Sequence, residues 1–223
     1  PKLSSLKKSG RKVEGNSYLN QSMQLSLIFA LPSSVGLIYL SFEIISSLFQ
    51  RGNFLVNDAI QTSKALSIYS LSIIPISLQM LLLNFYFAEK NIRIPFYYSL
   101  ASVFLNVSLA YTLLDKLEFL APPIAYAITN WLVFISLVYH TYKFGFYFNS
   151  TFKRGLPRIV LSSCFMLILL ILMKSFTLQY FSTQILTILW LSMVILLSGI
   201  SYFACLKFLG ILDKNFWVND FNK

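Results

Sequence analysis

The stretch IVLSSCFMLILLILMKSF, residues 159–176, decides the fold, since Lys174 is its only charged side chain. In a helix, which rises 1.5 Å per residue, a run of this length covers about 27 Å, close to the ~30 Å hydrocarbon core of a bilayer. A backbone in lipid has no water to bind, so it satisfies its own hydrogen bonds by forming an α-helix. The stretch therefore predicts one membrane-spanning helix.

Five further apolar stretches pass the same length test. They cover residues 22–42, 59–82, 96–114, 124–142 and 185–208. The first can extend to Phe49 as a tilted or interfacial segment. Pro32 and Pro75 fall inside the first two stretches, where they kink a helix and are tolerated if neighbouring groups satisfy the carbonyls that they free. The sequence predicts an all-α, polytopic transmembrane helix bundle of about six spans.

The composition agrees with a chain that has lipid as its solvent. Apolar residues make up 57% of the 223 residues and charged residues only 12%, too few to cover a soluble domain. The formal net charge of +10 comes from Lys and Arg in the short loops and not along one face, so we predict no nucleic-acid partner. Cys164 and Cys205 lie inside apolar runs and are interpreted as small packing residues.

Lys and Arg are shared unevenly between the loops. With six spans, fourteen of the 18 basic residues fall on one side of the membrane and three on the other. The majority are Lys2, Lys7, Lys8, Arg11, Lys12, Lys90, Arg93, Lys143, Lys153, Arg154, Arg158, Lys207, Lys214 and Lys223, and the minority are Arg51, Lys116 and Lys174. Because cytoplasmic loops are enriched in Lys and Arg, both ends of the chain are predicted to be cytoplasmic.

The spans and loops divide the chain into five segments. Residues 1–21 are predicted to be a basic cytoplasmic loop or the end of a preceding helix, 22–145 four transmembrane helices, 146–158 a basic cytoplasmic loop, 159–209 two terminal transmembrane helices and 210–223 a cytoplasmic tail. The opening is basic and polar and starts at Pro1 rather than Met, so we expect a fragment of a longer chain or a truncated gene product.

Polar residues inside the predicted spans recur at helical spacing. They are Ser63, Ser67, Ser70 and Ser77 in the second span, Ser99, Ser102 and Asn106 in the third, and Thr129, Asn130 and Ser136 in the fourth. Helix–helix packing explains most of them, whereas Asn106 costs more to bury and is the stronger candidate for a functional role. Glu43 and Lys64 are the charges closest to a span interior, and we expect both to snorkel to the interface.

No arrangement of residues suggests catalysis. The single histidine, His140, has no metal-ligand partner nearby in the sequence, and Asp115 and Glu118 share a loop in which carboxylates are usually solvated. No GxGxxG or P-loop sequence occurs. We predict that the protein is not an enzyme and uses no cofactor.

Several short segments form an ordered signature along the chain. They are LPSSVGL (31–37), LFQRGNF (48–54), Asp58-Ala59, Ala65-Leu66, Tyr69-Ser70, FYFA (85–88), RIP (93–95), Asn106, residues 125–129 and, more weakly, YFA (202–204). The main signature positions are Pro32, Phe49, Arg51, Gly52, Phe54, Tyr69, Phe85, Ala88, Arg93 and Pro95. In order and spacing, these segments resemble the second half of the MurJ/MviN lipid II flippases, within the superfamily of multidrug, oligosaccharidyl-lipid and polysaccharide exporters.

The resemblance implies the last six helices of a fourteen-helix exporter fold, four of which complete a C-terminal lobe while two extend an apolar groove. It also implies a bacterial inner-membrane protein that moves an undecaprenyl-diphosphate-linked peptidoglycan precursor from the cytoplasmic to the periplasmic leaflet by alternating access. A cationic cavity would hold the diphosphate and head group, and the groove would hold the lipid tail. Activity would need the missing N-terminal lobe as a partner.

The sequence departs from the family pattern at several positions. The family's cavity arginines lie upstream of this chain. Some relatives bind sodium through an Asn, an Asp four residues later and a Thr in the next helix. Asn106 and Thr129 match the first and the last, but Ala110 replaces the carboxylate. Ile94 stands where a Thr precedes the loop proline, and Ser72 stands where Gly is common.

Two other functions stay open from the sequence. One is another exporter of the same superfamily, for an O-antigen lipid or a drug. The other is a membrane fragment that transports nothing and only packs against a partner. The segments 48–54 and 85–88 favour the lipid II flippase.

Overall fold

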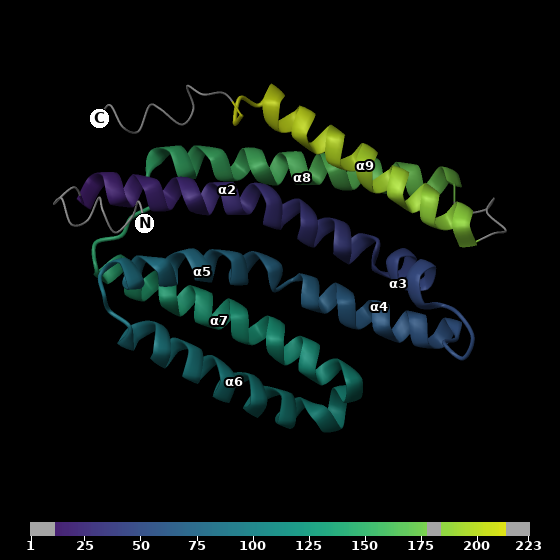
Figure 1. Cartoon of the computed structure of the whole chain (residues 1–223), viewed down its shortest axis with the longest axis horizontal. Coiled ribbons are helices and arrows are strands. Elements are labelled where there is room, and N and C mark those ends of the chain that lie inside the picture. The colour runs from purple at the N-terminus through teal and green to yellow at the C-terminus, as the bar shows by residue number, and fades with distance from the viewer. Residues whose placement is uncertain (1–11, 178–183, 213–223) are drawn as a thin grey trace.

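The computed structural model of the chain describes residues 12–177 and 184–212, and helices account for nearly all of them (Figure 1). In chain order these are α2 (Lys12–Tyr39), α3 (Ser41–Phe49), α4 (Val56–Ser70), α5 (Ile73–Ala88), α6 (Arg93–Leu117), the 3-10 helix η1 (Glu118–Leu120), α7 (Ala121–Lys143), α8 (Ser150–Thr177) and α9 (Gln184–Phe208). No strand occurs in the described residues. The fold is all-α, as the apolar runs predicted.

The helices are long enough to form a polytopic bundle. Five stretches have the length and composition to cross a membrane, namely Gly15–Tyr39, Val56–Ala88, Arg93–Lys143, Ser150–Ser175 and Ile185–Phe208. The stretch Arg93–Lys143 holds two of the six predicted spans, because α6 and α7 fold back on each other through η1 (Figure 1). The transmembrane bundle that the sequence predicted is therefore present.

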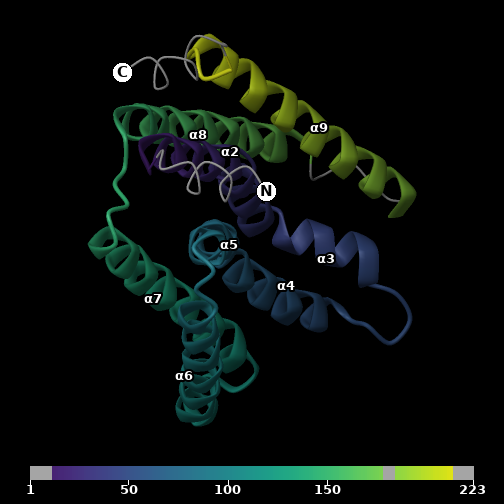
Figure 2. The same ribbon diagram turned by 60° about the vertical axis from the view of Figure 1, so that its left-hand side comes forward.

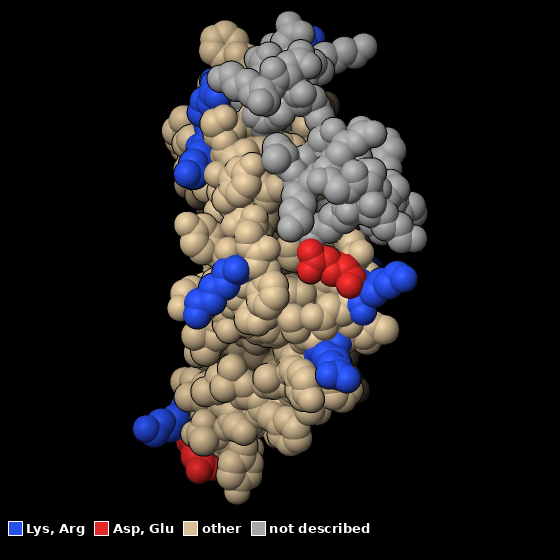
Figure 3. Space-filling model, turned by 90° about the vertical axis from the view of Figure 1, so that its left-hand side faces the viewer, with Lys and Arg blue, Asp and Glu red and all other residues tan. Residues whose placement is uncertain are grey.

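The helices pack side by side around α2 and α5, as Figures 1 and 2 show from two directions. α2 contacts α5 and α8, α9 contacts α8, and α6 contacts α7. α2, α6 and α8 begin at one end of the bundle, where α5, α7 and α9 finish. We call it the basic end, because its described residues include Lys90, Arg93, Lys143, Lys153, Arg154, Arg158 and Lys207. Figure 3 looks onto this end and shows Lys and Arg side chains spread over it.

Two helices begin earlier than predicted. α2 starts at Lys12 and not near residue 22, because Asn16 and Asn20 are buried against the bundle and belong to the packed helix. α8 starts at Ser150, so most of the loop predicted for 146–158 is its first turns. Phe49 ends a separate helix, α3, and not an extension of α2. Residues 1–11 of the predicted opening loop and residues 213–223 of the predicted tail lie outside the described residues.

Two asparagines on α2 hold the backbone of the loop between α7 and α8. The Asn16 amide donates to the Tyr147 carbonyl at 2.9 Å, and its oxygen accepts from the Tyr147 N–H at 3.3 Å. One turn later, the Asn20 amide donates to the same carbonyl at 2.9 Å, and its oxygen accepts from the Asn149 N–H at 3.2 Å. Residues four apart share a helix face, so both side chains reach one loop. This Asn clamp fixes where α8 starts.

The kink at Pro32 in α2 is closed by a side chain from another helix. Proline has no N–H, so the carbonyl of Ile28, one turn earlier, loses its usual donor. The hydroxyl of Tyr202 on α9 donates to this carbonyl at 2.7 Å, and the bond is buried. α9 is therefore bound to α2 at its bend, through a carbonyl that is free to accept this hydrogen bond because Pro32 has no N–H.

Pro75 produces the second kink and divides the predicted span 59–82 into α4 and α5. The carbonyl that it frees is that of Leu71, which accepts a hydrogen bond from the indole N–H of Trp131 on α7 at 3.1 Å. Beside it, the Ser34 hydroxyl on α2 donates to the Ser70 carbonyl at 2.7 Å. Neighbouring helices thus supply donors for the freed carbonyls at both prolines, as expected for prolines that a membrane helix tolerates.

Glu43 does not snorkel, contrary to the prediction. Its side chain is buried, and its Oε1 forms an ion pair with Lys174 Nζ at 2.5 Å. The same ammonium lies 4.8 Å from the centre of the Tyr39 ring. A buried carboxylate is costly unless a cation neutralises it, so the pair keeps α3 against α8 at the end opposite the basic end. Lys64 is exposed, as expected for a snorkelling side chain.

Tyr202→Phe is expected to lower the free energy of unfolding by about 1–2 kcal/mol, because it leaves the Ile28 carbonyl without a donor in apolar surroundings. The same substitution should cost clearly less in a Pro32→Ala background, because alanine restores a backbone N–H for this carbonyl. Unfolding of the chain in mixed micelles, followed by circular dichroism, measures both. Tyr111→Phe, at a residue 78% exposed, is the control. Equal costs in the two backgrounds would contradict the assignment.

Lys174→Met is expected to destabilise the chain by about 2 kcal/mol, and more than Glu43→Gln does, because only the first leaves a buried carboxylate without its cation. The lysine is 26% exposed and can reach the membrane surface when Glu43 is neutral. The double variant should regain most of the loss. Thermal unfolding in micelles compares the three, with Lys116→Met, on an exposed residue, as the control. A larger loss for Glu43→Gln would overturn this reading.

Candidate functional site

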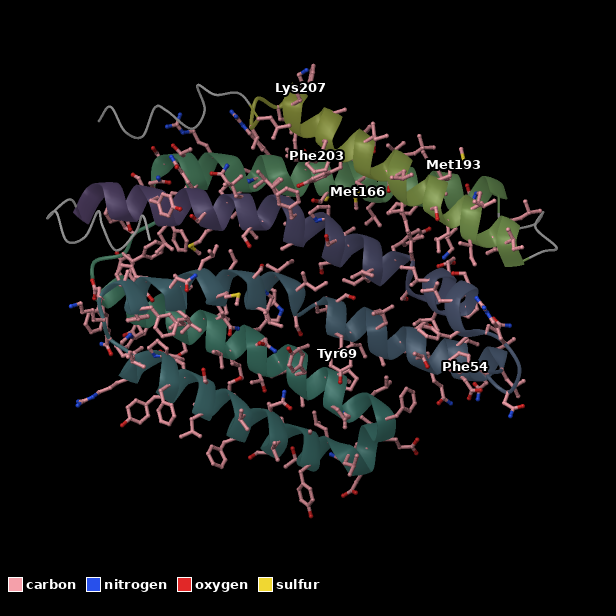
Figure 4. All side chains as sticks on the ribbon, in the orientation of Figure 1. Phe54, Tyr69, Met166, Met193, Phe203 and Lys207 are labelled. Carbon is pink, nitrogen blue, oxygen red and sulfur yellow. The ribbon has the colours of Figure 1, made fainter. Side chains whose placement is uncertain are left out.

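An apolar slot of about 360 Å³ lies between α2, α8 and α9. One wall is the face of α2 around the Pro32 kink, and the others are α8 near Met166 and α9 near Phe203. Figure 4 labels Met166 and Phe203, which lie between these helices. Tyr202, the residue that closes the kink, also lines the slot. The bend of α2 and the shape of the slot therefore depend on the same hydrogen bond.

Two glycines give the slot its width. Gly36 on α2 and Gly199 on α9 both line it, and a Cβ built on either would meet no atom within 4 Å. Gly155 on α8 is a contrasting case, because a Cβ there would collide with the buried side chain of Gln24 on α2. Gly155 is thus needed for close helix packing, whereas Gly36 and Gly199 leave open space.

Of the residues that the structure describes, no charged side chain lines the slot. Its polar lining residues are Ser33, Ser198 and Tyr202. The hydroxyl of Ser198 donates to the Ile195 carbonyl of its own helix at 3.0 Å, and that of Tyr202 donates to Ile28. A lining of this kind offers dispersion contacts to hydrocarbon and nothing to neutralise a charge. The slot suits an apolar chain and not a polar head group.

Most of the polar residues predicted inside the spans serve packing. The hydroxyls of Ser63, Ser67, Ser70 and Ser77 each donate to a carbonyl of their own helix. Ser99 and Ser102 line a separate cavity of about 190 Å³ between α5, α6 and α7, together with Gln79 and Tyr98. The Gln79 amide donates to the Asn130 carbonyl at 2.7 Å. This bond joins α5 to α7, whereas the serine hydroxyls of α4 and α5 bind carbonyls within their own helices.

The residues predicted as sodium ligands lie on the neighbouring helices α6 and α7. Thr129 is fully buried and its hydroxyl has no hydrogen-bond partner among the described residues, while Asn106 is half-buried. Ala110 offers no oxygen, and within the described residues no three His, Cys, Asp or Glu side chains gather as metal ligands. A hard cation needs several oxygen ligands. One free hydroxyl without a carboxylate does not fit a sodium ion.

His140 takes part in a side-chain cluster at the basic end. The Tyr86 hydroxyl on α5 lies 2.7 Å from His140 Nδ1 and 3.0 Å from the Thr141 hydroxyl, both on α7. The His140 ring also packs against that of Phe144, with ring centres 4.9 Å apart. The cluster joins α5 to α7 and has the character of a packing contact.

The first group of signature residues shapes the turn between α3 and α4. The rings of Phe49 and Phe54 contact each other at a centre-to-centre distance of 6.4 Å. Between them, Gly52 has a φ of +55°, a left-handed conformation that glycine adopts without strain, and the Phe54 N–H donates to the Arg51 carbonyl at 3.0 Å. Figure 4 shows Phe54 in this turn, at the end opposite the basic end.

The other signature residues lie elsewhere in the bundle. Phe85 and Ala88 are in the last turns of α5, and Arg93 and Pro95 are in the first turn of α6. Pro95 is suited to this position because an N–H there would have no partner within the helix. Tyr69 points from α4 toward α7, where its ring is 5.6 Å from that of Tyr126 (Figure 4). Of all the signature positions, Pro32 alone lines the slot.

Sequence reasoning did not single out Gly36, Gly199 and Tyr202. Gly36 and Tyr202 fall inside quoted segments of the signature, but a helix that is apolar all round does not reveal which face meets a neighbour. The proline four residues after Ile28 was the available signal, since it shows that this carbonyl needs a donor from outside α2. It does not show which helix supplies that donor.

Comparisons with known proteins agree on one family. The sequence matches the family model described as "Lipid II flippase MurJ" over residues 1–192. It is similar to the probable lipid II flippases MurJ of Buchnera aphidicola subsp. Acyrthosiphon pisum, at 29% identity over 94% of this chain and 42% of the relative, and of Rickettsia prowazekii, at 25% over 84% and 37%. The probable lipid II flippase MurJ of Aquifex aeolicus is 44% identical over 38% of this chain and 17% of its own length.

The fold agrees with a solved structure described as "Lipid II flippase MurJ, inward closed conformation". The TM-score is 0.75 at 24% sequence identity, over 91% of this chain and 40% of that one. The chain spans about two fifths of the length of the relatives that it matches along most of its sequence. Because the family match covers residues 1–192 of 223, the chain belongs to the lipid II flippase MurJ family.

Proposed function

We propose that this chain is the C-terminal part of a flippase that carries lipid II, the undecaprenyl-diphosphate-linked peptidoglycan precursor, from the cytoplasmic to the periplasmic leaflet of the bacterial inner membrane. Its relatives are named as probable lipid II flippases. The observation that carries the proposal is the apolar slot between α2, α8 and α9 in a chain of this family. A slot without charges suits the polyprenyl tail of such a substrate.

The slot accounts for only one half of the substrate. The diphosphate and the sugar–peptide head group need cations and hydrogen-bond donors, which the slot lacks. We place the head-group site at a cavity formed with the upstream lobe that the longer relatives contain. The tail in the slot and the head group in the cavity would then be held by different parts of one protein.

The orientation follows from the charges. We assign the basic end, which holds Lys90, Lys143 and Lys153, to the cytoplasm, so both ends of the chain are cytoplasmic. The slot runs along α2 from Ile28 and reaches Ile44 on α3, so we assign it to the middle of the bundle and its periplasmic half. Alternating access would bend the lobe at the two proline kinks. We assign no sodium ion to Asn106 and Thr129, because Ala110 stands where the ion site needs a carboxylate.

Gly199→Phe is expected to weaken the apparent affinity for lipid II about ten-fold, because the ring displaces at least two methylene groups of the tail, each worth about 0.8 kcal/mol. Ile200→Phe is the matched control, since this next residue on α9 is 65% exposed and lies outside the slot. Concentration-dependent flipping in liposomes is the measurement, using this chain fused behind the upstream part of its Buchnera relative.

The same fusion separates the possible cargoes. It should restore growth to cells depleted of their own lipid II flippase, which an O-antigen or drug exporter would not do. If Gly199→Phe and Ile200→Phe both flip lipid II normally, the slot does not hold the tail. If the unsubstituted fusion folds and inserts but fails to rescue, the lipid II assignment falls.

The 223-residue chain reconstituted alone is expected to show no flipping above that of empty liposomes. Alternating access needs two lobes that move relative to each other, and this chain supplies one lobe and two groove helices. It also lacks the proposed head-group site. Fluorescent lipid II and a reagent that reaches only the outer leaflet give the readout. The fusion protein in matched liposomes is the positive control, and flipping by the chain alone would contradict the proposed division of the site.

A further inference from the structure

A second apolar cavity, distinct from the slot, opens between α2, α5, α7 and the start of α8. This trough has a volume of about 530 Å³. Met23, Leu27 and Leu31 line it from α2, and eight residues of helix place the first and last of them about 12 Å apart. Trp131 lines it near the middle of α7, and Lys153 lines it in the first turn of α8. The trough therefore extends from the middle of the bundle to the basic end.

The trough and the slot lie on different faces of α2. Residues 23, 27 and 31 follow one helical stripe, whereas Phe29, Ser33 and Gly36 of the slot fall on the other side of the same helix. Both cavities adjoin the stretch of α2 from Leu27 to Pro32, and the body of the helix lies between them. A molecule in the trough would therefore occupy a place of its own and not continue into the slot.

Among the described residues, Lys153 is the only charged one that lines the trough. Its ammonium makes no ion pair or hydrogen bond with any described residue, while the neighbouring Arg154 is held by the Ser150 carbonyl and hydroxyl, each at 3.3 Å. Among the side chains that the structure describes, the only carboxylate at this end is Glu89, at the end of α5. Figure 3 shows that Lys and Arg side chains on the face at this end outnumber those of Asp and Glu. Among the described side chains, no carboxylate lines the trough beside Lys153, so this ammonium is available to an anion.

We propose that the trough binds an anionic diacyl phospholipid from the leaflet that faces the basic end. Its 12 Å apolar length is most of the ~15 Å depth of one leaflet, so an acyl chain fits along Leu27 and Leu31. The phosphate of the head group then lies at the level of Lys153. A zwitterionic lipid fills the apolar part equally well but leaves the ammonium without a net negative partner. Charge complementarity therefore selects the head group, and the apolar wall holds the chain.

Trp131 provides a reporter inside the trough. In the chain carrying Trp190→Phe and Trp217→Phe, it is the only tryptophan left of three. Bromine atoms on an acyl chain quench a tryptophan that they touch. In phosphatidylcholine nanodiscs, a small fraction of brominated phosphatidylglycerol is expected to quench Trp131 with about five-fold higher apparent affinity than brominated phosphatidylcholine. This ratio corresponds to the ~1 kcal/mol typical of one basic residue near an anionic lipid.

Substitutions at two adjacent residues test which charge is responsible. Lys153→Gln should bring the ratio close to one, Lys153→Arg should keep it, and Arg154→Gln, the matched control outside the trough, should leave it unchanged. Equal quenching by the two lipids in the unsubstituted chain would overturn the proposal, as would an equal loss in Lys153→Gln and Arg154→Gln. The test needs no transport, so its outcome is independent of whether the protein flips lipid II.

Discussion

A backbone carbonyl inside a membrane must find a donor within the protein, and this requirement explains how the helices of this chain are joined. Pro32 and Pro75 each remove an N–H from the middle of a span. The carbonyls that lose their donors accept hydrogen bonds from Tyr202 and Trp131, on two other helices. Because no water is present in the hydrocarbon core, each of these bonds replaces a group that would otherwise stay unpaired. Each proline thereby specifies a neighbour for its helix.

The sequence predicted the parts of the fold that depend on composition. Long apolar runs predicted membrane-spanning helices, and the loop charges predicted which helix ends lie together, because both patterns can be read without knowing how the helices face one another. The start of α2 was predicted too late, since Asn16 and Asn20 look like loop residues until the backbone of residues 147–149 is seen beside them. Glu43 was expected at the interface because its partner, Lys174, is far away in the sequence.

The candidate site was predictable only in part, and for a similar reason. The family resemblance predicted that residues 159–176 and 185–208 extend an apolar groove. Residues of α8 and α9 line the slot, and their role as a lipid groove stays a prediction. The contribution of α2 was not foreseen, because an all-apolar helix carries no periodic signal for the face that it turns inward. The signature positions gave little guidance, since Phe49, Gly52 and Pro95 form turns at opposite ends of the bundle. In this chain the residues easiest to recognise build the scaffold.

The two cavities beside α2 lie on different faces of this helix and differ in their linings. The slot is narrow because its walls meet at Tyr202 and wide enough to admit a chain because Gly36 and Gly199 have no side chains. The trough has only large apolar walls and one cation at its mouth. The slot therefore suits an uncharged chain along its whole length, while the trough also suits an anionic group at the end where Lys153 lies. One helix, bent at Pro32, presents these different surfaces to lipid.

The Asn clamp has a mechanical consequence for the pair formed by α8 and α9. The loop that enters α8 is bound to α2 through Asn16 and Asn20, the C-terminal part of α9 is bound to α2 through Tyr202, and the far end of α8 is bound to α3 through Lys174. The chain enters this pair of helices from α7. The hydrogen bonds and the ion pair just named, however, connect the pair to α2 and α3. When the bundle changes shape, the terminal hairpin must follow the tilt of α2 as one body, and the α7–α8 loop acts as a short tether.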